Sequence, residues 1–177
     1  MSQPSIVRAA VAEDSTEIWR LFRLLHAENG MLRMSEAKVQ HYIDRWLHPE
    51  DISQKDDGPR GLIGVIGPVG KLEGAIGLMF GSPWYSDVIT LDEYLNFVDP
   101  AHRNSNHAKA LISYAKHMVD NLRPTYPDCR LTIGVLSTKR TVAKVRLYER
   151  QLQPMGAFFT HPPIEDAMLP RKLRVGH

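Results

Sequence analysis

The spacing of hydrophobic positions divides the chain into helical and extended segments. Apolar residues three and four positions apart are typical of amphipathic helices, whereas apolar runs and alternating patterns indicate strands. The helical pattern lies within residues 12–30, 35–49, 107–122 and 141–153. The strand pattern lies within residues 6–10, 61–80, 88–98, 131–136 and 157–161, and two runs within 61–80 flank a predicted hairpin turn. The predicted order is therefore β-α-α-β-β-β-α-β-α-β.

An order in which strands and helices alternate is typical of an α/β or α+β sandwich built on one sheet. With 177 residues, the chain has the size of one domain. No internal repeat, low-complexity segment or linker divides it. We therefore predict a single domain over residues 1–177.

Composition narrows the class of protein. Hydrophobic residues make up 43% and charged residues 24% of the chain, which excludes a disordered, collagen-like or coiled-coil chain. Cys129 is the only cysteine, which excludes an intrachain disulfide, and no paired-histidine pattern is present, so we predict no metal site. No stretch approaches the roughly 20 apolar residues of a membrane span. We expect a cytoplasmic protein that does not enter the membrane.

The charge is unevenly distributed, although the net charge of the chain is only +2. Residues 1–100 hold nine basic and fifteen acidic side chains, a net charge of −6. Residues 101–153 hold ten basic and three acidic side chains, a net charge of +7. This asymmetry favours a polyanionic ligand near the basic segment, and the alternative is a solvated helix face.

A strand, a short basic loop and a helix start follow one another at residues 98–108. The unpaired N–H groups at a helix N-terminus attract anions, so a loop that leads into them suits a pyrophosphate. The residues of this predicted phosphate loop are Arg103, Asn104, Ser105, Asn106, His107 and Ala108. Arg103 would add a charge-assisted hydrogen bond, and His102 and His107 are further candidates for phosphate contact.

The same stretch resembles the GNAT superfamily of acyl-CoA N-acyltransferases. In that family a strand ending Val-x-Pro precedes a loop of the form Gln/Arg-x-x-Gly-x-Gly/Ala. Here Val98-Asp99-Pro100 precedes Arg103–Ala108, with Asn106 where the family has its central glycine. Asparagine tolerates a positive φ better than other non-glycine residues, so we expect the loop shape to be kept.

Further motifs extend the resemblance over nearly the whole chain. Leu147-Tyr148-Glu149 and Gly156-Ala157-Phe158 look like the family's segment after the fifth strand. Two positions depart from the family pattern, where Thr141 replaces an Asn and Lys144 replaces an Ala. The resemblance implies acetyl-CoA (coenzyme A) as the cofactor, and a mixed, mostly antiparallel sheet of six or seven strands flanked by helices.

The resemblance also implies where the acyl-CoA binds. The fourth and fifth strands, residues 88–98 and 131–136, are expected to splay apart and admit it. A β-bulge near Phe97 would turn backbone groups of Phe97 and Val98 toward the pantetheine arm. Lys139 would reach the 3′-phosphate, and the alternative is that it is simply solvated.

Tyr148 matches the tyrosine that, in this family, commonly gives a proton to the departing CoA thiolate. A phenol with an ordinary pKa of about 10 keeps its proton at neutral pH and can donate it. The alternative is a core tyrosine on the apolar face of its helix.

The strand at residues 88–98 offers two candidates for a general base. Glu93 interrupts an apolar stripe, and desolvation there would raise its pKa. The stripe consists of Ile89, Leu91, Leu95 and Phe97. Asp92 would lie on the opposite, more polar face, together with Thr90, Tyr94 and Asn96. We favour Glu93, with Asp92, a water relay or no base as alternatives; either carboxylate could instead form a structural ion pair.

Three aromatic residues are candidates for binding the acceptor substrate. Trp84 and Tyr85 lie in a loop just before the strand 88–98, and Tyr94 lies on its polar face. Their positions in the predicted elements suggest one wall of an acceptor pocket. The alternative is plain packing.

Three functions are open on this basis, and the resemblance favours the first. It is an enzyme that transfers an acetyl or short acyl group from acetyl-CoA to an unidentified primary amine by direct attack in a ternary complex. The second is a CoA-binding domain without catalysis, which the departures from the family pattern at Asn106, Thr141 and Lys144 favour. The third is a nucleic-acid-associated protein, which we do not favour because no helix-turn-helix or RNP pattern is present. A homodimer is left open.

Overall fold

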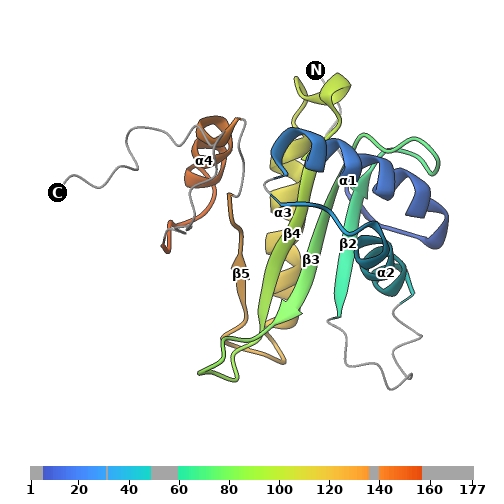
Figure 1. The fold of residues 1–177 in the computed structure, drawn as a ribbon. Helices are drawn as coiled ribbons and strands as arrows, with labels where there is room; N and C mark the ends of the chain where they lie inside the picture. Colours follow the sequence, from blue (N-terminus) through green and yellow to red (C-terminus); the bar gives the residue numbers. More distant parts are fainter. Residues whose placement is uncertain (1–5, 31, 49–59, 136–139, 157–177) are drawn as a thin grey trace.

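The structure is a computed structural model of the 177-residue chain, and it describes residues 6–30, 32–48, 60–135 and 140–156. One sheet lies between helices on its two faces (Figure 1). The elements are β1 (Arg8–Ala9), η1 (Ala12–Asp14), α1 (Ser15–Asn29), α2 (Glu36–Leu47), β2 (Gly61–Ile66), β3 (Gly74–Gly81), β4 (Thr90–Val98), η3 (Pro100–His102), α3 (His107–Leu122), β5 (Arg130–Thr132) and α4 (Thr141–Glu149).

The five described strands follow chain order across the sheet, β1-β2-β3-β4-β5. The strands β1 to β4 pair antiparallel, whereas β5 runs parallel to β4. A parallel neighbour requires a crossover connection, and α3 forms it across one face of the sheet. This mixed, mostly antiparallel sheet with flanking helices confirms the predicted fold class.

Two apolar clusters fix the helices to the two faces of the sheet. On one face α1 and α2 pack through buried residues that include Leu21 and Trp46. On the other face α3 packs through residues that include Leu111 and Ala115. In the described part of the chain, no helix is both long enough and apolar enough to cross a membrane.

Glycines in β2 allow aromatic side chains from both layers to approach the sheet closely. A Cβ atom at Gly61 would lie 2.4 Å from the indole of Trp46, and one at Gly64 would lie 2.5 Å from the ring of Tyr114. Both separations are shorter than van der Waals contact allows, so a larger residue would push these rings away from the sheet.

Most predicted elements are present, but some boundaries differ. The helix α4 ends at Glu149, before the predicted end at Gln153, and β5 covers only Arg130–Thr132. The predicted strand 157–161 lies outside the described residues. The structure therefore describes five strands where six or seven were expected.

A β-bulge at Tyr94 divides β4 into two parts. Leu95 pairs with Gly77 and Glu93 pairs with Leu78, so Tyr94 is the inserted residue without a ladder partner. A bulge bends its strand and reverses the alternation of side chains beyond it. The bulge therefore lies earlier in the strand than predicted.

This bulge overturns the prediction of a single apolar stripe along the strand, and the bulge expected near Phe97 was wrong in position. Leu91 packs against α3, whereas Leu95 and Phe97 pack against α1 and α2. Asn96, predicted on the opposite face from Glu93, shares its face instead. An alternating sequence gives no sign of one inserted residue, so the pattern alone could not reveal the change of face.

The strands β4 and β5 pair over only three residues and then diverge. Their register runs from Thr90 opposite Arg130 to Asp92 opposite Thr132. Beyond Asp92, no described residue pairs with β4 on the β5 side. This divergence confirms the predicted splay between the fourth and fifth strands.

Asp14 is a fully buried carboxylate that ties the start of α1 to β1. The guanidinium of Arg8 donates to both of its oxygens, at 2.7 and 2.9 Å, and the N–H of Val11 donates at 2.9 Å. Arg8 also donates to the carbonyl of Gly67 in the β2–β3 turn, at 3.3 Å. Burial opposes ionisation, but these donors outweigh it and hold the pKa of Asp14 below its usual 3.8.

We expect Asp14→Asn to lower the free energy of unfolding by about 2 kcal/mol at pH 7, because the amide is a poorer acceptor for Arg8. A depressed pKa stabilises the fold above the unfolded pKa, near 3.8, and this contribution is lost as the pH falls further. The difference between the two proteins, measured by urea denaturation, should therefore shrink at pH 3. Asp120→Asn, which changes an exposed carboxylate on α3, is the control, and equal effects of the two variants would contradict the prediction.

Candidate active site

A groove follows the edge of β4 that β5 leaves uncovered. Two adjoining hollows, about 130 and 450 Å³ in volume, share Glu28, Phe97, Arg103 and Arg140 as lining residues. The smaller hollow is also lined by Asn96, Val98, Ser105, Ala108, Lys144, Leu147 and Tyr148. The groove is therefore formed by α1, β4, the loop before α3, and α4.

Tyr148 reaches from α4 to the strand β4. The side-chain amide of Asn96 donates a hydrogen bond to the phenol oxygen at 3.0 Å. Burial raises the pKa of Tyr148 and the nearby Glu93 carboxylate raises it further, although the hydrogen bond from Asn96 acts in the opposite direction. The phenol therefore keeps its proton, and no described residue accepts that proton.

Glu93 lies on the same face of β4 as Asn96 and is partly buried. Burial raises the pKa of Glu93 to about 7, and the charge of Lys144 and a hydrogen bond from the N–H of Gly134 limit the rise. The expected desolvation is thus present, although it does not come from the apolar stripe. A carboxyl with this pKa is close to half ionised at neutral pH and can accept a proton.

Lys144 brings a cation into the groove at a position where the sequence departs from the family pattern. Burial lowers the pKa of Lys144, while the carboxylates of Glu93 and Glu28 raise it, and Arg103 and Arg140 lower it. The ammonium of Lys144 and the carboxylate of Glu93 therefore each favour the charged form of the other.

No protein-family model and no curated protein matches the sequence. Solved structures do match. A possible acetyltransferase from Clostridium difficile 630 superposes with a TM-score of 0.63 at 13% identity, over 92% of this chain and 99% of its own. A GNAT family acetyltransferase from Staphylococcus aureus superposes with a TM-score of 0.55 at 10% identity, over 89% of this chain and 98% of its own. The chain has the GNAT fold.

Another structure with this fold contains a ligand. AAC(6′)-Iy, in complex with the bisubstrate analogue CoA-S-monomethyl-acetylneamine, superposes with a TM-score of 0.61 at 13% identity, over 91% of this chain and 99% of its own. At identities this low the comparison establishes the GNAT fold and not the chemistry of the site.

The loop before α3, which contains the residues of the predicted phosphate loop, leaves two backbone donors available. Ser105 Oγ accepts from the N–H of His107 at 3.2 Å, whereas no described residue accepts from the N–H groups of Ala108 and Lys109. Asn106 has a φ of −85°, so its tolerance of a positive φ is not needed here. The helix start therefore presents two N–H donors without a glycine at this position.

Arg103 is already engaged within the protein. Its guanidinium pairs with Glu28 at 2.5 Å, donates to the carbonyl of Val98 at 3.3 Å, and stacks 5.1 Å from the centre of the Phe97 ring. Arg103 thus joins α1 to the end of β4 and has its charge balanced by Glu28. If Arg103 contacts a phosphate as predicted, its guanidinium must divide its N–H donors between the phosphate and Glu28.

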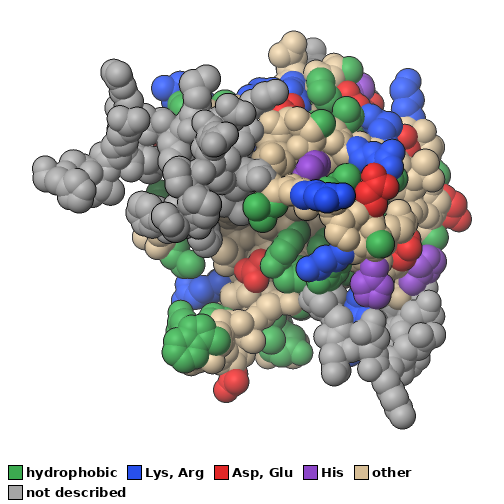
Figure 2. Space-filling view, viewed as in Figure 1, with side chains coloured by type: hydrophobic (Ala, Val, Ile, Leu, Met, Phe, Trp, Pro, Cys, Tyr) green, Lys and Arg blue, Asp and Glu red, His purple; other side chains and the backbone are tan. Residues whose placement is uncertain are grey.

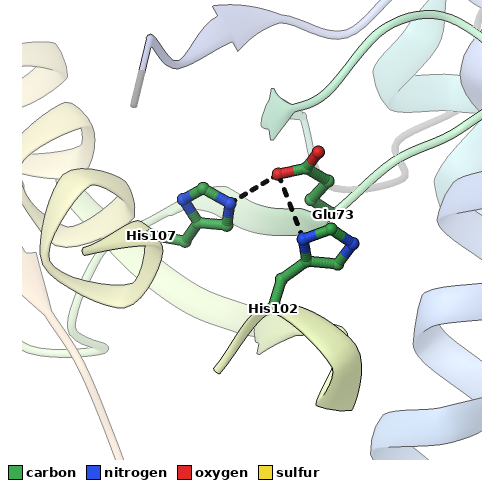
Figure 3. A group of neighbouring side chains, drawn as sticks. All are labelled: Glu73, His102 and His107. Carbon is green, nitrogen blue, oxygen red and sulfur yellow. Dashed lines mark hydrogen bonds and ion pairs between the residues drawn. The ribbon is translucent and has the colours of Figure 1, made fainter. Parts of the chain in front are cut away.

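The two histidines that were candidates for phosphate contact face a carboxylate instead. His107 Nε2 lies 2.6 Å and His102 Nδ1 lies 3.4 Å from the same oxygen of Glu73 (Figure 3). Both rings therefore converge on Glu73. Asn104, Ser105 and Asn106 are the exposed residues of the loop.

The remaining candidates lie away from the groove. Asp92 accepts a hydrogen bond from Thr90 Oγ1 at 3.2 Å, and Tyr94 packs 6.5 Å from the ring of Trp46 on α2. Trp84 and Tyr85 lie in the loop between β3 and β4 and are 96% and 74% exposed. In Figure 2, exposed hydrophobic side chains lie at the lower left of the molecule. None of the three aromatic candidates, nor Asp92, is brought to Tyr148.

Two residues of the groove were not predicted from the sequence, and one predicted site residue is not among the described residues. Lys139 falls outside the described residues. Asn96 and Glu28 line the groove but were not predicted as site residues. The bulge hides Asn96, and no local signal connects Glu28 to a loop that follows some 75 positions later in the sequence.

We expect the carboxyl of Glu93 to titrate with a midpoint near pH 7 in a carbon-13 NMR titration, because burial disfavours its ionised form. Lys144→Met should move the midpoint upward, since the cation that limits the rise is removed. Lys116→Met, which changes an exposed lysine on α3, is the control and should leave the midpoint unchanged. A midpoint near the ordinary value of 4.5 would contradict the assignment.

Proposed function

We propose that the protein is an N-acyltransferase that transfers an acetyl or other short acyl group from acyl-CoA to a primary amine. One observation carries this proposal. The uncovered edge of β4 presents a carboxyl with a pKa near 7, Glu93, on the same face as Asn96 and the proton-bearing Tyr148. A proton acceptor and a proton donor on one face of β4 are the two groups that aminolysis of a thioester requires.

The fit of acyl-CoA to this groove is supported by backbone groups of the chain itself. The available N–H groups of Ala108 and Lys109 at the start of α3 suit a pyrophosphate. The uncovered edge of β4 offers main-chain donors and acceptors to an extended amide-containing arm, as a sheet edge does to an added strand. Arg140, at the start of α4, adds a cation to the same groove.

In the proposed reaction, acyl-CoA supplies the thioester carbonyl that the amine attacks. Glu93 accepts a proton from the amine nitrogen as the new C–N bond forms. Main-chain N–H groups of the β4 edge are available to the oxygen of the tetrahedral intermediate. Tyr148 donates its proton as the C–S bond breaks, and the thiol of CoA leaves. Asn96 holds the phenol oxygen so that its proton points away from the amide donor.

The acceptor is proposed to be a cationic amine. The first 100 residues carry a net charge of −6, because they hold nine basic and fifteen acidic side chains. The predicted acceptor residues Tyr94, Trp84 and Tyr85 do not add to this argument, because Tyr94 packs beside Trp46 and the other two are exposed in the loop that precedes β4, away from Tyr148. A homodimer and a cytoplasmic location stay predictions.

A CoA-binding domain without catalysis is the second candidate. The ion pair between Arg103 and Glu28 and the partly buried cation of Lys144 both occupy the groove with charges that the chain itself balances. This candidate predicts binding of CoA without release of thiol in the presence of any amine.

Calorimetric titration with acetyl-CoA, CoA and dephospho-CoA tests the proposal first. We expect micromolar binding of acetyl-CoA, weakened for dephospho-CoA if a cation of the groove contacts the 3′-phosphate. Thiol release is then measured over a panel of primary amines. Absence of binding at millimolar acetyl-CoA would overturn the proposal, and binding without turnover would favour the second candidate.

Tyr148→Phe should lower kcat by about 100-fold or more, because the leaving thiolate loses its proton donor. The affinity for acetyl-CoA should change by no more than about twofold, since the ring and its packing are kept. Tyr126→Phe, at an exposed tyrosine, is the matched control. An unchanged kcat in Tyr148→Phe would exclude the donor role.

The rate should fall as the pH drops below about 7, because protonated Glu93 cannot accept the proton of the amine. Glu93→Gln should remove this acidic limb of the profile of kcat/KM against pH and lower its plateau. Asp92→Gln is the comparison on the opposite face of β4. If the acidic limb disappears in that variant and persists in Glu93→Gln, the base is Asp92.

A further inference from the structure

Three side chains of metal-binding type converge where the β2–β3 turn, η3 and the start of α3 meet (Figure 3). They are Glu73, His102 and His107, and one ligand atom of each lies within 4.8 Å of the other two. The imidazole rings lie 6.0 Å apart at an interplanar angle of 22°. The side chains are 28%, 35% and 11% exposed, respectively, so an ion and water can reach the cluster from solvent.

Hydrogen bonds fix the backbone that carries two of these side chains. The N–H of Glu73 donates to Ile66 and its carbonyl accepts from the N–H of Asp99, both at 2.8 Å. Asp99 in turn caps η3, since its carboxylate accepts from Ala101 at 3.0 Å and its carbonyl accepts from His102 at 2.8 Å. The positions of Glu73 and His102 are thus set relative to each other.

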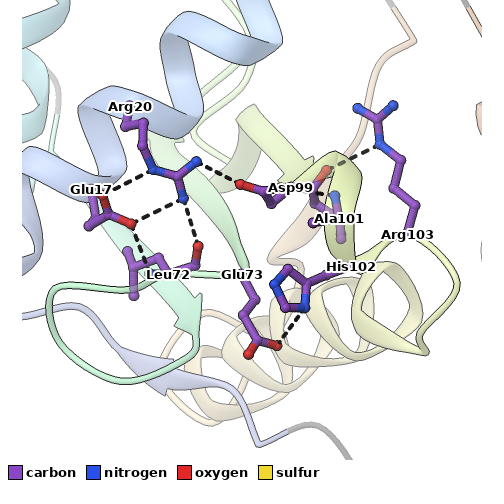
Figure 4. Close-up of polar contacts among 9 residues, drawn as sticks. Glu17, Arg20, Leu72, Glu73, Asp99, Ala101, His102 and Arg103 are labelled. Carbon is purple, nitrogen blue, oxygen red and sulfur yellow. Dashed lines mark hydrogen bonds and ion pairs between the residues drawn. The ribbon is translucent and has the colours of Figure 1, made fainter.

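Arg20 on α1 holds this frame from the other side (Figure 4). Its guanidinium donates to Asp99 at 2.6 Å, to the carbonyl of Leu72 at 2.8 Å, and to both oxygens of Glu17 at 3.0 Å. The network therefore clamps Leu72, next to Glu73, and Asp99, three residues before His102. A supported frame of this kind is what a ligand-binding constellation needs.

We propose that Glu73, His102 and His107 bind a divalent transition-metal ion, with Zn²⁺ as the best match. Two imidazoles and one carboxylate suit zinc, which commonly takes three protein ligands and a water molecule in tetrahedral geometry. Calcium and magnesium prefer sets made only of oxygen ligands, which this cluster does not offer. The fold creates the site, because no paired-histidine spacing announces it in the sequence.

The distances require only a small adjustment. Zinc–ligand bonds of about 2.0–2.2 Å place neighbouring ligand atoms roughly 3.3 Å apart in a tetrahedron. His102 Nδ1 is already 3.4 Å from Glu73 Oε2. His107 Nε2, at 2.6 Å from the same oxygen, must move away slightly, and the partly exposed Glu73 side chain can provide that movement.

The alternative is that the cluster binds a proton instead of a metal ion. The two imidazoles then share the Glu73 carboxylate as a hydrogen-bond acceptor. Glu73→Gln separates the two interpretations. The amide oxygen still accepts a hydrogen bond from an imidazole, but the anionic ligand is lost. His102→Gln, at a more exposed position, removes one nitrogen ligand with little effect on the core.

A bound ion would also restrain the predicted phosphate loop. His102 and His107 lie immediately before and after Arg103–Asn106, so coordination would join the two ends of this segment. Amide hydrogen exchange of residues 103–108 should therefore slow when zinc is added. This readout does not depend on any catalytic activity of the protein.

The experiment is calorimetric titration of the metal-free, full-length protein with ZnCl₂. We expect one ion to bind with micromolar affinity, and Glu73→Gln and His102→Gln each to weaken it by at least about tenfold. His117→Gln, at an exposed histidine on α3, is the matched control and should bind as the parent protein does. Circular dichroism and thermal unfolding check that every variant is folded.

Cobalt(II) provides a second measurement, because its visible absorption reports the geometry of the ligands. We expect a tetrahedral spectrum in the parent protein that is lost in Glu73→Gln, together with the slowed exchange of residues 103–108. The proposal is overturned if no zinc binds at micromolar concentrations. It is equally overturned if zinc binding persists unchanged in both Glu73→Gln and His102→Gln.

Discussion

The divergence of β4 from β5 is the constraint on which the candidate site depends. The two strands pair only from Thr90 to Asp92, and the rest of β4 is left with an uncovered edge. The bulge at Tyr94 lies two residues after Asp92, where the pairing ends. It turns Glu93 and Asn96 to the same face, where Tyr148 of α4 meets them. Without the bulge, regular alternation would place Glu93 and Asn96 on opposite faces of the sheet.

The charges around the groove are largely balanced within the chain. Glu28 neutralises Arg103, and Lys144 lies within the electrostatic reach of both Glu93 and Glu28. On the face seen in Figure 2, basic and acidic side chains are interspersed. The strongly basic segment of the sequence is therefore not a simple phosphate-binding surface. Arg103, Arg140 and Lys144 are the basic residues of this segment that line the groove, and a partly buried cation needs a partner.

The loop before α3 contributes residues both to the groove and to the cluster around Glu73. Ala108 of this loop lines the groove, while the side chains of His102 and His107 contact Glu73 on the opposite side. The frame of Arg20 and Asp99 holds the entry to this loop independently of any ligand. A loop fixed at both ends loses less conformational entropy when it binds an anion.

The sequence by itself determined the order of the elements as far as α4, the ends of α1, α2 and α3 to within a few residues, the hairpin, and the family likeness at residues 98–108 and 147–149. These features follow from local spacing, from capping residues and from short motifs, which a sequence displays directly. It also pointed to Glu93 and Tyr148 as chemically special. Only the tertiary structure decided that these two residues share a face with Asn96, that Arg103 is paired with Glu28, and that His102 and His107 meet Glu73. One inserted residue in β4 and contacts between distant segments produce these arrangements, and neither leaves a periodic trace in the sequence.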